Sequence, residues 1–166
     1  FFSLFFYPMG GNLLFNKNIE NKHKINIDYF KYIHLPLHTK VAYEQVFSFT
    51  KKISSYCNIN YAENLSFDTM LSVIIGKNRI SFFPFIKKDS KNNQMMQLFN
   101  DDFIPKINIE IKANNIIILV ADSNDKFSFG DINYSNNYVF KSFRVSSEKD
   151  KPRFLKLYYP ENCSKS

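Results

Sequence analysis

Short apolar runs separated by turn residues constrain the fold of this chain more than any other feature of its sequence. From Tyr29 onward these runs recur at roughly the 8–12-residue spacing that is typical of antiparallel sandwiches. Residues 106–112 are the clearest case, because Ile107, Ile109 and Ile111 alternate with polar residues, as in a strand with one buried face. We therefore expect a buried strand here, and replacing Ile109 with Ala is expected to cost about 2–5 kcal/mol of folding free energy.

The expected strands cover most of the chain after residue 29. They span residues 30–35, 42–50, 57–61, 69–75, 79–85, 106–112, 115–121, 126–129, 138–144 and 153–158. The apolar run from Ile116 to Val120 suits a central strand. Residues 90–102 are expected to form one short helix or a long loop. The sequence therefore predicts an all-β fold, an antiparallel two-sheet sandwich of the jelly-roll type.

The chain is expected to form one domain. Its 166 residues are enough to bury about two thirds of the surface of the unfolded chain. We expect residues 1–28 to be a lead-in segment or the remnant of a preceding region, residues 29–160 the sandwich, and residues 161–166 a tail. The apolar residues 1–15 are interrupted by Pro8, Gly10 and Gly11 and are too short to cross a bilayer, so no membrane span is expected.

The composition suggests an anionic partner only weakly. The net charge is +7, which would suit an acidic glycan, a membrane surface or nucleic acid. The lysines are scattered along the chain, however, and scattered lysines usually form a solvated surface. The nineteen Phe and ten Tyr predict a core filled by aromatic rings, although A/T-rich codons also favour Phe, Tyr, Asn, Lys and Ile. We expect no nucleic-acid partner.

The two cysteines and the glycosylation motifs leave the compartment open. Cys57 and Cys163 lack the spacing of a metal site, and they either form one long-loop disulfide or stay reduced. Three N-x-Ser/Thr sequons, at Asn64, Asn133 and Asn162, would be glycan acceptors in a secreted protein. Chance sequons are common in an Asn-rich chain, so both a secreted and a cytoplasmic protein remain possible.

No catalytic constellation is recognisable. The only histidines are His23, His34 and His38, and no nucleophile elbow or phosphate-binding loop accompanies them. His34 and His38 lack a third metal ligand. The adjacent Asp101 and Asp102 would point to opposite faces of a strand. We therefore expect neither an enzyme nor a cofactor or metal.

The order of the expected strands resembles that of the galectin family from about Tyr32 to Val145. The segments that carry the resemblance are His34-Leu35-Pro36-Leu37, Asn58-Ile59-Asn60-Tyr61, Phe67-Asp68-Thr69-Met70-Leu71 and residues 103–129. They are similar to the family's opening strand, its Phe-x-Ile-Asn-Leu strand, the start of its ligand-binding strand and its late three-strand meander. The resemblance implies a non-catalytic carbohydrate-binding domain.

The family's sugar site is degenerate in this chain. Galectins stack a galactoside on a Trp and read its hydroxyls with a His-x-Asn-Pro-Arg strand, whereas this chain has no Trp. Aligned from Asp68, the positions of the family's His, Asn and Arg fall on Ser72, Ile74 and Gly76, and a shifted register brings Arg79 near the Arg position.

The resemblance therefore implies a carbohydrate site made of Ser72, Lys77, Asn78 and Arg79, beside residues 81–83. The expected ligand is a glycan or glycoprotein, with acidic glycans included because the chain is basic, and lactose is not expected to bind. The alternative is a protein-interaction or structural domain without sugar binding.

Overall fold

The computed structural model describes residues 22–30, 32–66, 69–81, 99–122, 137–145 and 153–164. About 47% of these residues are helical and 30% lie in strands, so the expected all-β sandwich is wrong and the fold is α+β. The strands are β1 (Lys22–Lys24), β2 (His34–Pro36), β3 (Tyr61–Asn64), β4 (Ile116–Asp122), β5 (Tyr138–Arg144) and β6 (Phe154–Pro160). The α-helices are α2 (Leu37–Tyr56), α3 (Thr69–Ile75) and α5 (Ile104–Lys112). Shorter helical turns are η3 (Asp28–Phe30), η4 (Phe99–Phe103) and η5 (Glu161–Ser164).

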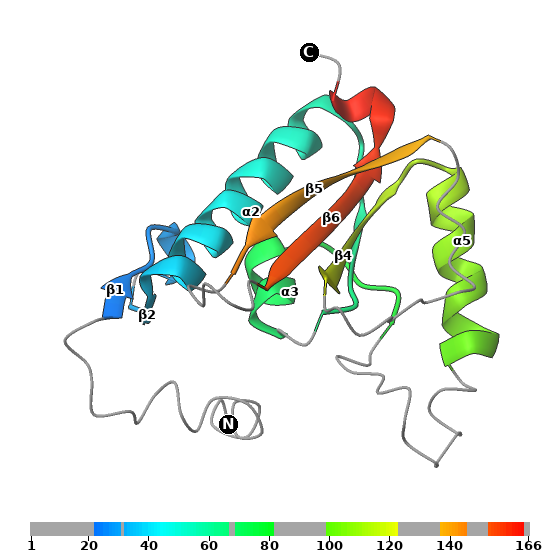
Figure 1. The fold of residues 1–166 in the computed structure, drawn as a ribbon. Helices are drawn as coiled ribbons and strands as arrows, with labels where there is room; N and C mark the ends of the chain where they lie inside the picture. Colours follow the sequence, from blue (N-terminus) through cyan, green and yellow to red (C-terminus); the bar gives the residue numbers. More distant parts are fainter. Residues whose placement is uncertain are drawn as a thin grey trace.

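A four-stranded mixed sheet in the order β3-β4-β6-β5 organises the domain. β3 and β4 are parallel, with Tyr61 opposite Ile116, whereas β6 is antiparallel to both of its neighbours. The connection from β3 to β4 carries α3 and α5, which is the kind of crossover that a parallel pair requires. Figure 1 shows α2 and α5 on either side of the strands.

The sheet is buried on both faces where β4 runs through it. Ile117 and Leu119 belong to a core with α2, α3 and strands β5 and β6. Ile116 and Ile118 belong to a second core with the apolar side of α5. Because successive residues of a strand point to opposite faces, an unbroken apolar run is what a central strand covered by helices on both sides needs. The expected strand at residues 115–121 is therefore present, and it is central.

A small ribbon of β1 and β2 closes one end of the first core. The two strands are antiparallel, with His23 opposite Leu35. Ile25, Ile27 and Leu35 are buried in the same core as α2. Residues at both ends of the described chain therefore contribute to the core, since Cys163 in η5 is buried as well.

Helix α2 replaces the strand expected at residues 42–50. Its buried residues, Ala42, Tyr43, Val46, Thr50 and Ile53, recur every three or four positions, which places them on one side of a helix. Gln45, Lys51 and Lys52 are exposed. The strand expected at residues 69–75 is likewise wrong, because these residues form α3, which ends at Gly76 with a left-handed φ of 65°.

Helix α5 replaces the strand expected at residues 106–112. Ile107 and Ile111 are fully buried, but Ile109 is 62% exposed. Ile104, Ile107 and Ile111 form the buried side, at the i, i+3, i+7 spacing of a helix, and Pro105 lies in its first turn, where proline is tolerated. The cost of about 2–5 kcal/mol expected for shortening Ile109 belongs instead to Ile107.

Other expected strands have mixed outcomes. The one at residues 138–144 coincides with β5, and the one at residues 153–158 is the main part of β6. Residues 57–60 precede β3 rather than forming a strand, and only residues 34–35 of the first expected strand lie in β2. The strand at residues 126–129, residues 82–85 and most of residues 90–102 lie outside the described residues.

Candidate functional site

The carboxylate of Glu63 in β3 is the centre of a buried polar cluster. Its side chain is 0% exposed, and it accepts a hydrogen bond from Arg79 Nη2 at 2.9 Å. The backbone N–H groups of Ile80 and Ser81 donate to it at 3.1 and 3.0 Å, and the Ser81 hydroxyl donates to it as well. A cationic partner and several hydrogen-bond donors together offset the cost of removing this carboxylate from water. We name Glu63, Arg79, Ile80 and Ser81 the Glu63 cluster.

The Glu63 cluster attaches the chain after α3 to the open side of β3. The backbone oxygen of Asn78 accepts a hydrogen bond from the backbone N–H of Ala62 at 2.9 Å, and an isolated parallel bridge pairs Asn78 with Tyr61. Residues 78–81 thus lie beside β3, where they satisfy backbone groups that an edge strand would otherwise expose.

The residues of the expected sugar site therefore lie near one another, but most of their polar groups bind the protein itself. The Lys77 ammonium donates to the backbone oxygen of Ile59 at 2.8 Å. The hydroxyl of Ser72, on α3, accepts from the amide of Asn64 at 2.8 Å. Arg79 binds Glu63, and the side chain of Asn78 is exposed. Ser72, Lys77 and Arg79 thus have structural partners.

Several groups that can carry chemistry are also bonded within the fold. The structure contains no group of three or more His, Cys, Asp or Glu side chains that could hold a metal ion within its described ranges. Cys57 and Cys163 form a disulfide. The Tyr138 hydroxyl donates to the backbone oxygen of Ile116 at 2.9 Å, and burial raises the pKa of Tyr138 well above its ordinary value. Tyr138 therefore stays protonated at physiological pH.

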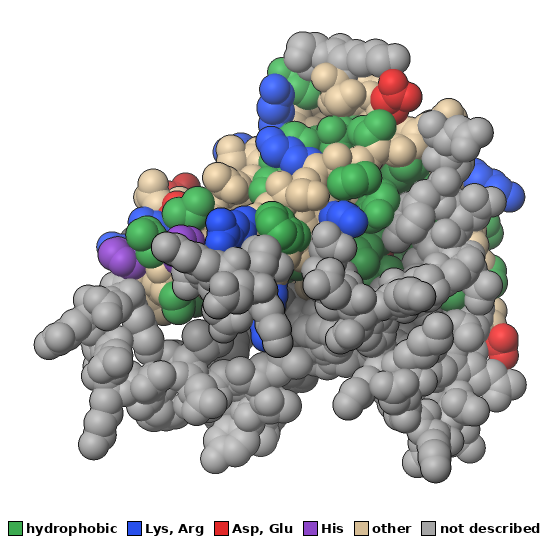
Figure 2. Space-filling model, in the orientation of Figure 1, with side chains coloured by type: hydrophobic (Ala, Val, Ile, Leu, Met, Phe, Trp, Pro, Cys, Tyr) green, Lys and Arg blue, Asp and Glu red, His purple; other side chains and the backbone are tan. Residues whose placement is uncertain are grey.

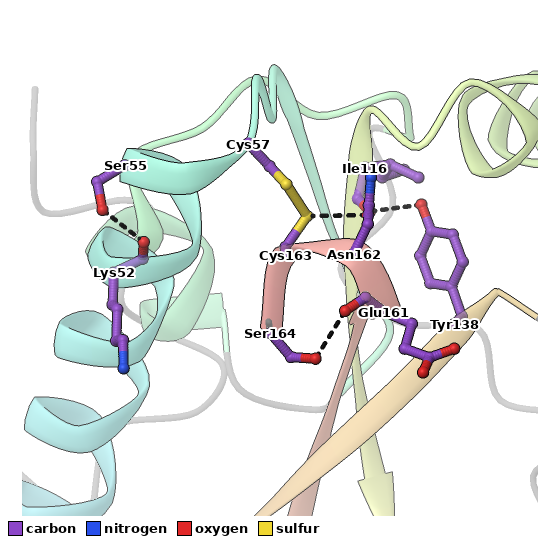
Figure 3. The surroundings of a disulfide bond; sticks show 9 residues. All are labelled: Lys52, Ser55, Cys57, Ile116, Tyr138, Glu161, Asn162, Cys163 and Ser164. Atoms are coloured by element: carbon purple, nitrogen blue, oxygen red, sulfur yellow. Dashed lines mark hydrogen bonds between the residues drawn. A yellow bond between two sulfur atoms is a disulfide. The ribbon is translucent and has the colours of Figure 1, made fainter. Parts of the chain in front are cut away.

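The disulfide joins the end of α2 to η5. The Cα atoms of Cys57 and Cys163 are 5.7 Å apart although 106 positions separate them in sequence. Figure 3 shows the bond between the last turn of α2 and the turn that follows β6, with Asn162 beside it. The Cys163 sulfur lies 3.5 Å from the side-chain oxygen of Asn162. The bond thus closes a long loop that contains β3, β4, β5 and β6.

An open hollow of about 580 Å³ lies beside this disulfide. It is lined by Tyr56, Cys57, Asn58, Asn60, Ala113, Asn114, Asn115 and Asn162, and we name it the asparagine hollow. Tyr56 is 52% exposed. Asn115 is held in place, because its side chain binds Glu110 and the backbone N–H of Asn60. Asn114 has a φ of 54°, a left-handed conformation that asparagine tolerates after a helix.

Strand β5 is the second exposed feature. It is last in the sheet order, so within the described residues it has a strand neighbour on one side only. Phe140, Lys141 and Ser142 are exposed in succession. The ring centroids of Phe140 and Tyr158 are 5.4 Å apart. The Lys156 ammonium lies 5.2 Å from the centroid of the Phe140 ring. Figure 2 shows hydrophobic and basic side chains intermixed over the region of β5 and β6.

Two backbone hydrogen bonds fix which residues of β5 face its open side. Val145 donates to Arg153, and Glu161 donates to Asn137, so the odd-numbered residues of the strand are bonded to β6. Hydrogen-bonded and non-bonded pairs alternate along an antiparallel ladder. The backbone N–H and C=O groups of Tyr138, Phe140, Ser142 and Arg144 therefore point away from β6.

Neither exposed feature was predicted from the sequence. The asparagines of the hollow come from three separate segments, and a chain rich in Asn gives no sign of which of them meet. The strand at residues 138–144 was predicted, but its place at the end of the sheet depends on pairing that residue order does not reveal.

Comparisons with known proteins identify no relative of this chain. No family model, no curated protein and no solved structure matches this chain. Nothing therefore identifies a galectin-like domain. Among the helices in the described ranges, none is long and apolar enough to cross a membrane.

Proposed function

We propose that this domain is a non-catalytic interaction module that binds an extended, acidic protein segment along β5. The observation that carries the proposal is the side of this strand that has no strand neighbour within the described residues, where the backbone groups of Phe140 and Ser142 point away from β6. An extended peptide can add to such a strand through backbone hydrogen bonds, while pockets and charges select its side chains.

The side chains around β5 favour an acidic partner with apolar residues. Neither β5 nor β6 contains an Asp or Glu. Lys141 projects toward α2, where its ammonium lies 4.3 Å from the Phe49 ring. Lys156 and the 53% exposed Phe140 lie on the opposite face of the sheet. A partner strand beside β5 would thus meet a cationic side chain on each face and an aromatic ring on one.

The absence of catalysis in this proposal is supported by the bonding of four side chains of reactive types. Glu63 and Arg79 bind each other, and Cys57 and Cys163 are joined. Each of these groups stabilises the fold in its present state. These four residues bind one another and are not directed toward a substrate.

A peptide-display selection on the oxidised protein at low ionic strength tests the proposal. We expect the selected peptides to alternate apolar and acidic residues and to bind less tightly at high salt, because screening weakens surface charge attraction. Ser142→Pro should weaken this binding, since proline removes the one N–H of Ser142, which points to the open side and makes no bond to β6. We expect at least a tenfold loss of affinity, about 1.4 kcal/mol.

A matched control is Ser142→Ala, which keeps the backbone donor and should bind the same peptides with unchanged affinity. Thermal unfolding of both variants checks that the sheet is intact. Peptides that bind the proline variant as tightly as the original protein, or a selection that enriches no acidic sequence, would contradict strand addition at β5.

The asparagine hollow supports a second candidate, glycan binding. Amide side chains donate to and accept from hydroxyl groups, and the exposed ring of Tyr56 offers an apolar surface to a sugar. This candidate keeps the expected ligand class but moves the site away from Ser72, Lys77, Asn78 and Arg79. A glycan array that includes sulfated and sialylated species separates it from the first candidate, because strand addition predicts no glycan binding.

A further inference from the structure

The sequons differ in whether the folded protein leaves their asparagine accessible. Asn64 is 3% exposed, its amide donates to Ser72, and its side-chain oxygen accepts from the backbone and hydroxyl of Ser66. An oligosaccharide on Asn64 is incompatible with this packing. Asn162 is exposed, as is Ser164, the third residue of the same sequon. Asn133 lies outside the described residues.

The disulfide is an independent indication of the compartment. Disulfides form and persist in oxidising environments such as the secretory pathway, and they are rare where thiols are kept reduced. The Cys57–Cys163 bond joins the end of α2 to η5, across 106 positions of sequence, and is partly buried, with Cys163 only 3% exposed. A protein that depends on this bond folds where N-glycosylation also takes place.

We infer that Asn162 is an N-glycan acceptor. In the reaction, the Asn162 amide nitrogen forms a C–N bond with the anomeric carbon of an oligosaccharide. The oligosaccharide is carried on a polyprenyl diphosphate, which departs as the leaving group, and the nitrogen loses one proton. The resulting amide is uncharged, so no buried ion pair has to be broken.

The middle residue of this sequon is Cys163, and this sets an order of events. In the folded protein Cys163 is bonded to Cys57, and Asn162 lies in the tight turn η5, where the Ser164 hydroxyl donates to the backbone oxygen of Glu161 at 2.6 Å. Figure 3 shows these contacts around the disulfide. A sequon held in this turn cannot extend into an enzyme's active site. Glycan transfer therefore precedes disulfide closure.

The asparagine hollow then has room for the first sugar of the attached glycan. Asn162 lines the hollow together with Asn58, Asn60 and Tyr56, whose polar and aromatic groups suit a sugar. A glycan on Asn162 would fill the site of the second candidate function and leave β5 open. The inference itself does not depend on either proposed function.

The test is expression of the full chain behind a cleavable signal peptide in secretory cells, with a polar C-terminal extension so that Asn162 clears the translocation channel during synthesis. The Asn133→Gln background removes the sequon outside the described residues. We expect a gel shift that peptide N-glycosidase F removes, and that Asn162→Gln and Ser164→Ala abolish. Enzymatic release from the folded, secreted protein in isotopically labelled water should mark residue 162 and leave Asn64 unmarked, because a chain with a glycan on Asn64 cannot adopt this packing.

The order of events is tested with Cys57→Ser, which leaves Cys163 unable to close the bond. We expect the glycosylated fraction at Asn162 to rise in this variant. A non-reducing gel confirms that the parent forms the disulfide. An unglycosylated Asn162, a glycan on Asn64, or a protein whose cysteines stay reduced in the secretory pathway would each overturn the inference.

Discussion

Removing the Cys57–Cys163 disulfide is expected to lower the free energy of unfolding by about 4–5 kcal/mol. In the chain-entropy account, a cross-link stabilises by restricting the unfolded chain, and a loop of about 100 residues gives about 4.7 kcal/mol. The loop here joins residues 106 positions apart, so the effect is near the top of the range. Domains of this size typically have only about 5–15 kcal/mol in total.

The measurement is guanidinium unfolding of the variant Cys57→Ser with Cys163→Ser, compared with the oxidised protein. Replacing both residues avoids a reactive thiol. The chemically reduced parent is the matched control, and it should show the same loss. A loss below about 1 kcal/mol would mean that the bond hardly restricts the unfolded chain.

Arg79→Ala is expected to destabilise the domain by about 3–5 kcal/mol. The substitution leaves the fully buried carboxylate of Glu63 without its cationic partner, and an uncompensated buried charge is costly. The backbone donors of Ile80 and Ser81 remain, but they carry no full charge. Urea unfolding of the variant measures the effect.

The control for this prediction is Arg79→Met combined with Glu63→Gln. This pair keeps the volume and an acceptor for the N–H groups of Ile80 and Ser81 while removing both charges, so it should recover most of the lost stability. If Arg79→Ala instead left stability unchanged and weakened binding of sulfated or sialylated glycans, Arg79 would be a ligand-binding residue, as the sequence-based site implied.

The strands of the sheet were predictable where their pattern allows one interpretation. The unbroken apolar run at residues 116–120 can be buried on both faces, and it forms β4. The helices were not predictable in the same way. In α5, isoleucines at positions 107, 109 and 111 fit a strand, while those at 104, 107 and 111 fit a helix equally well. Packing against β4 decides between them.

Residue type adds to the difficulty in α2. Tyr43, Val46, Thr50 and Ile53 are β-branched or aromatic, which favours strands by intrinsic preference. Their spacing of three and four positions fits a helix, and burial of that side against the sheet outweighs the preference. The spacing of the apolar residues therefore indicated a helix, while their residue types indicated a strand.

The candidate sites were less predictable than the fold, for a different reason. The contact of Glu63 with Arg79 spans 16 positions, and in the hollow Asn60 is hydrogen-bonded to Asn115, 55 positions away. Such contacts depend on the sheet order. A wrong sheet order therefore gives a wrong site even where individual residues, such as Arg79, are recognised as noteworthy.

The position of β6 within the sheet has a consequence for how the protein is made. β6 is the last strand in sequence among the described residues, yet it lies between β4 and β5 and pairs with both. During synthesis on the ribosome, β4 and β5 therefore emerge before the strand that joins them exists. The sheet can be completed only after residues 154–160 leave the exit tunnel, and a nascent chain stalled before Phe154 would present two unjoined strand edges to chaperones.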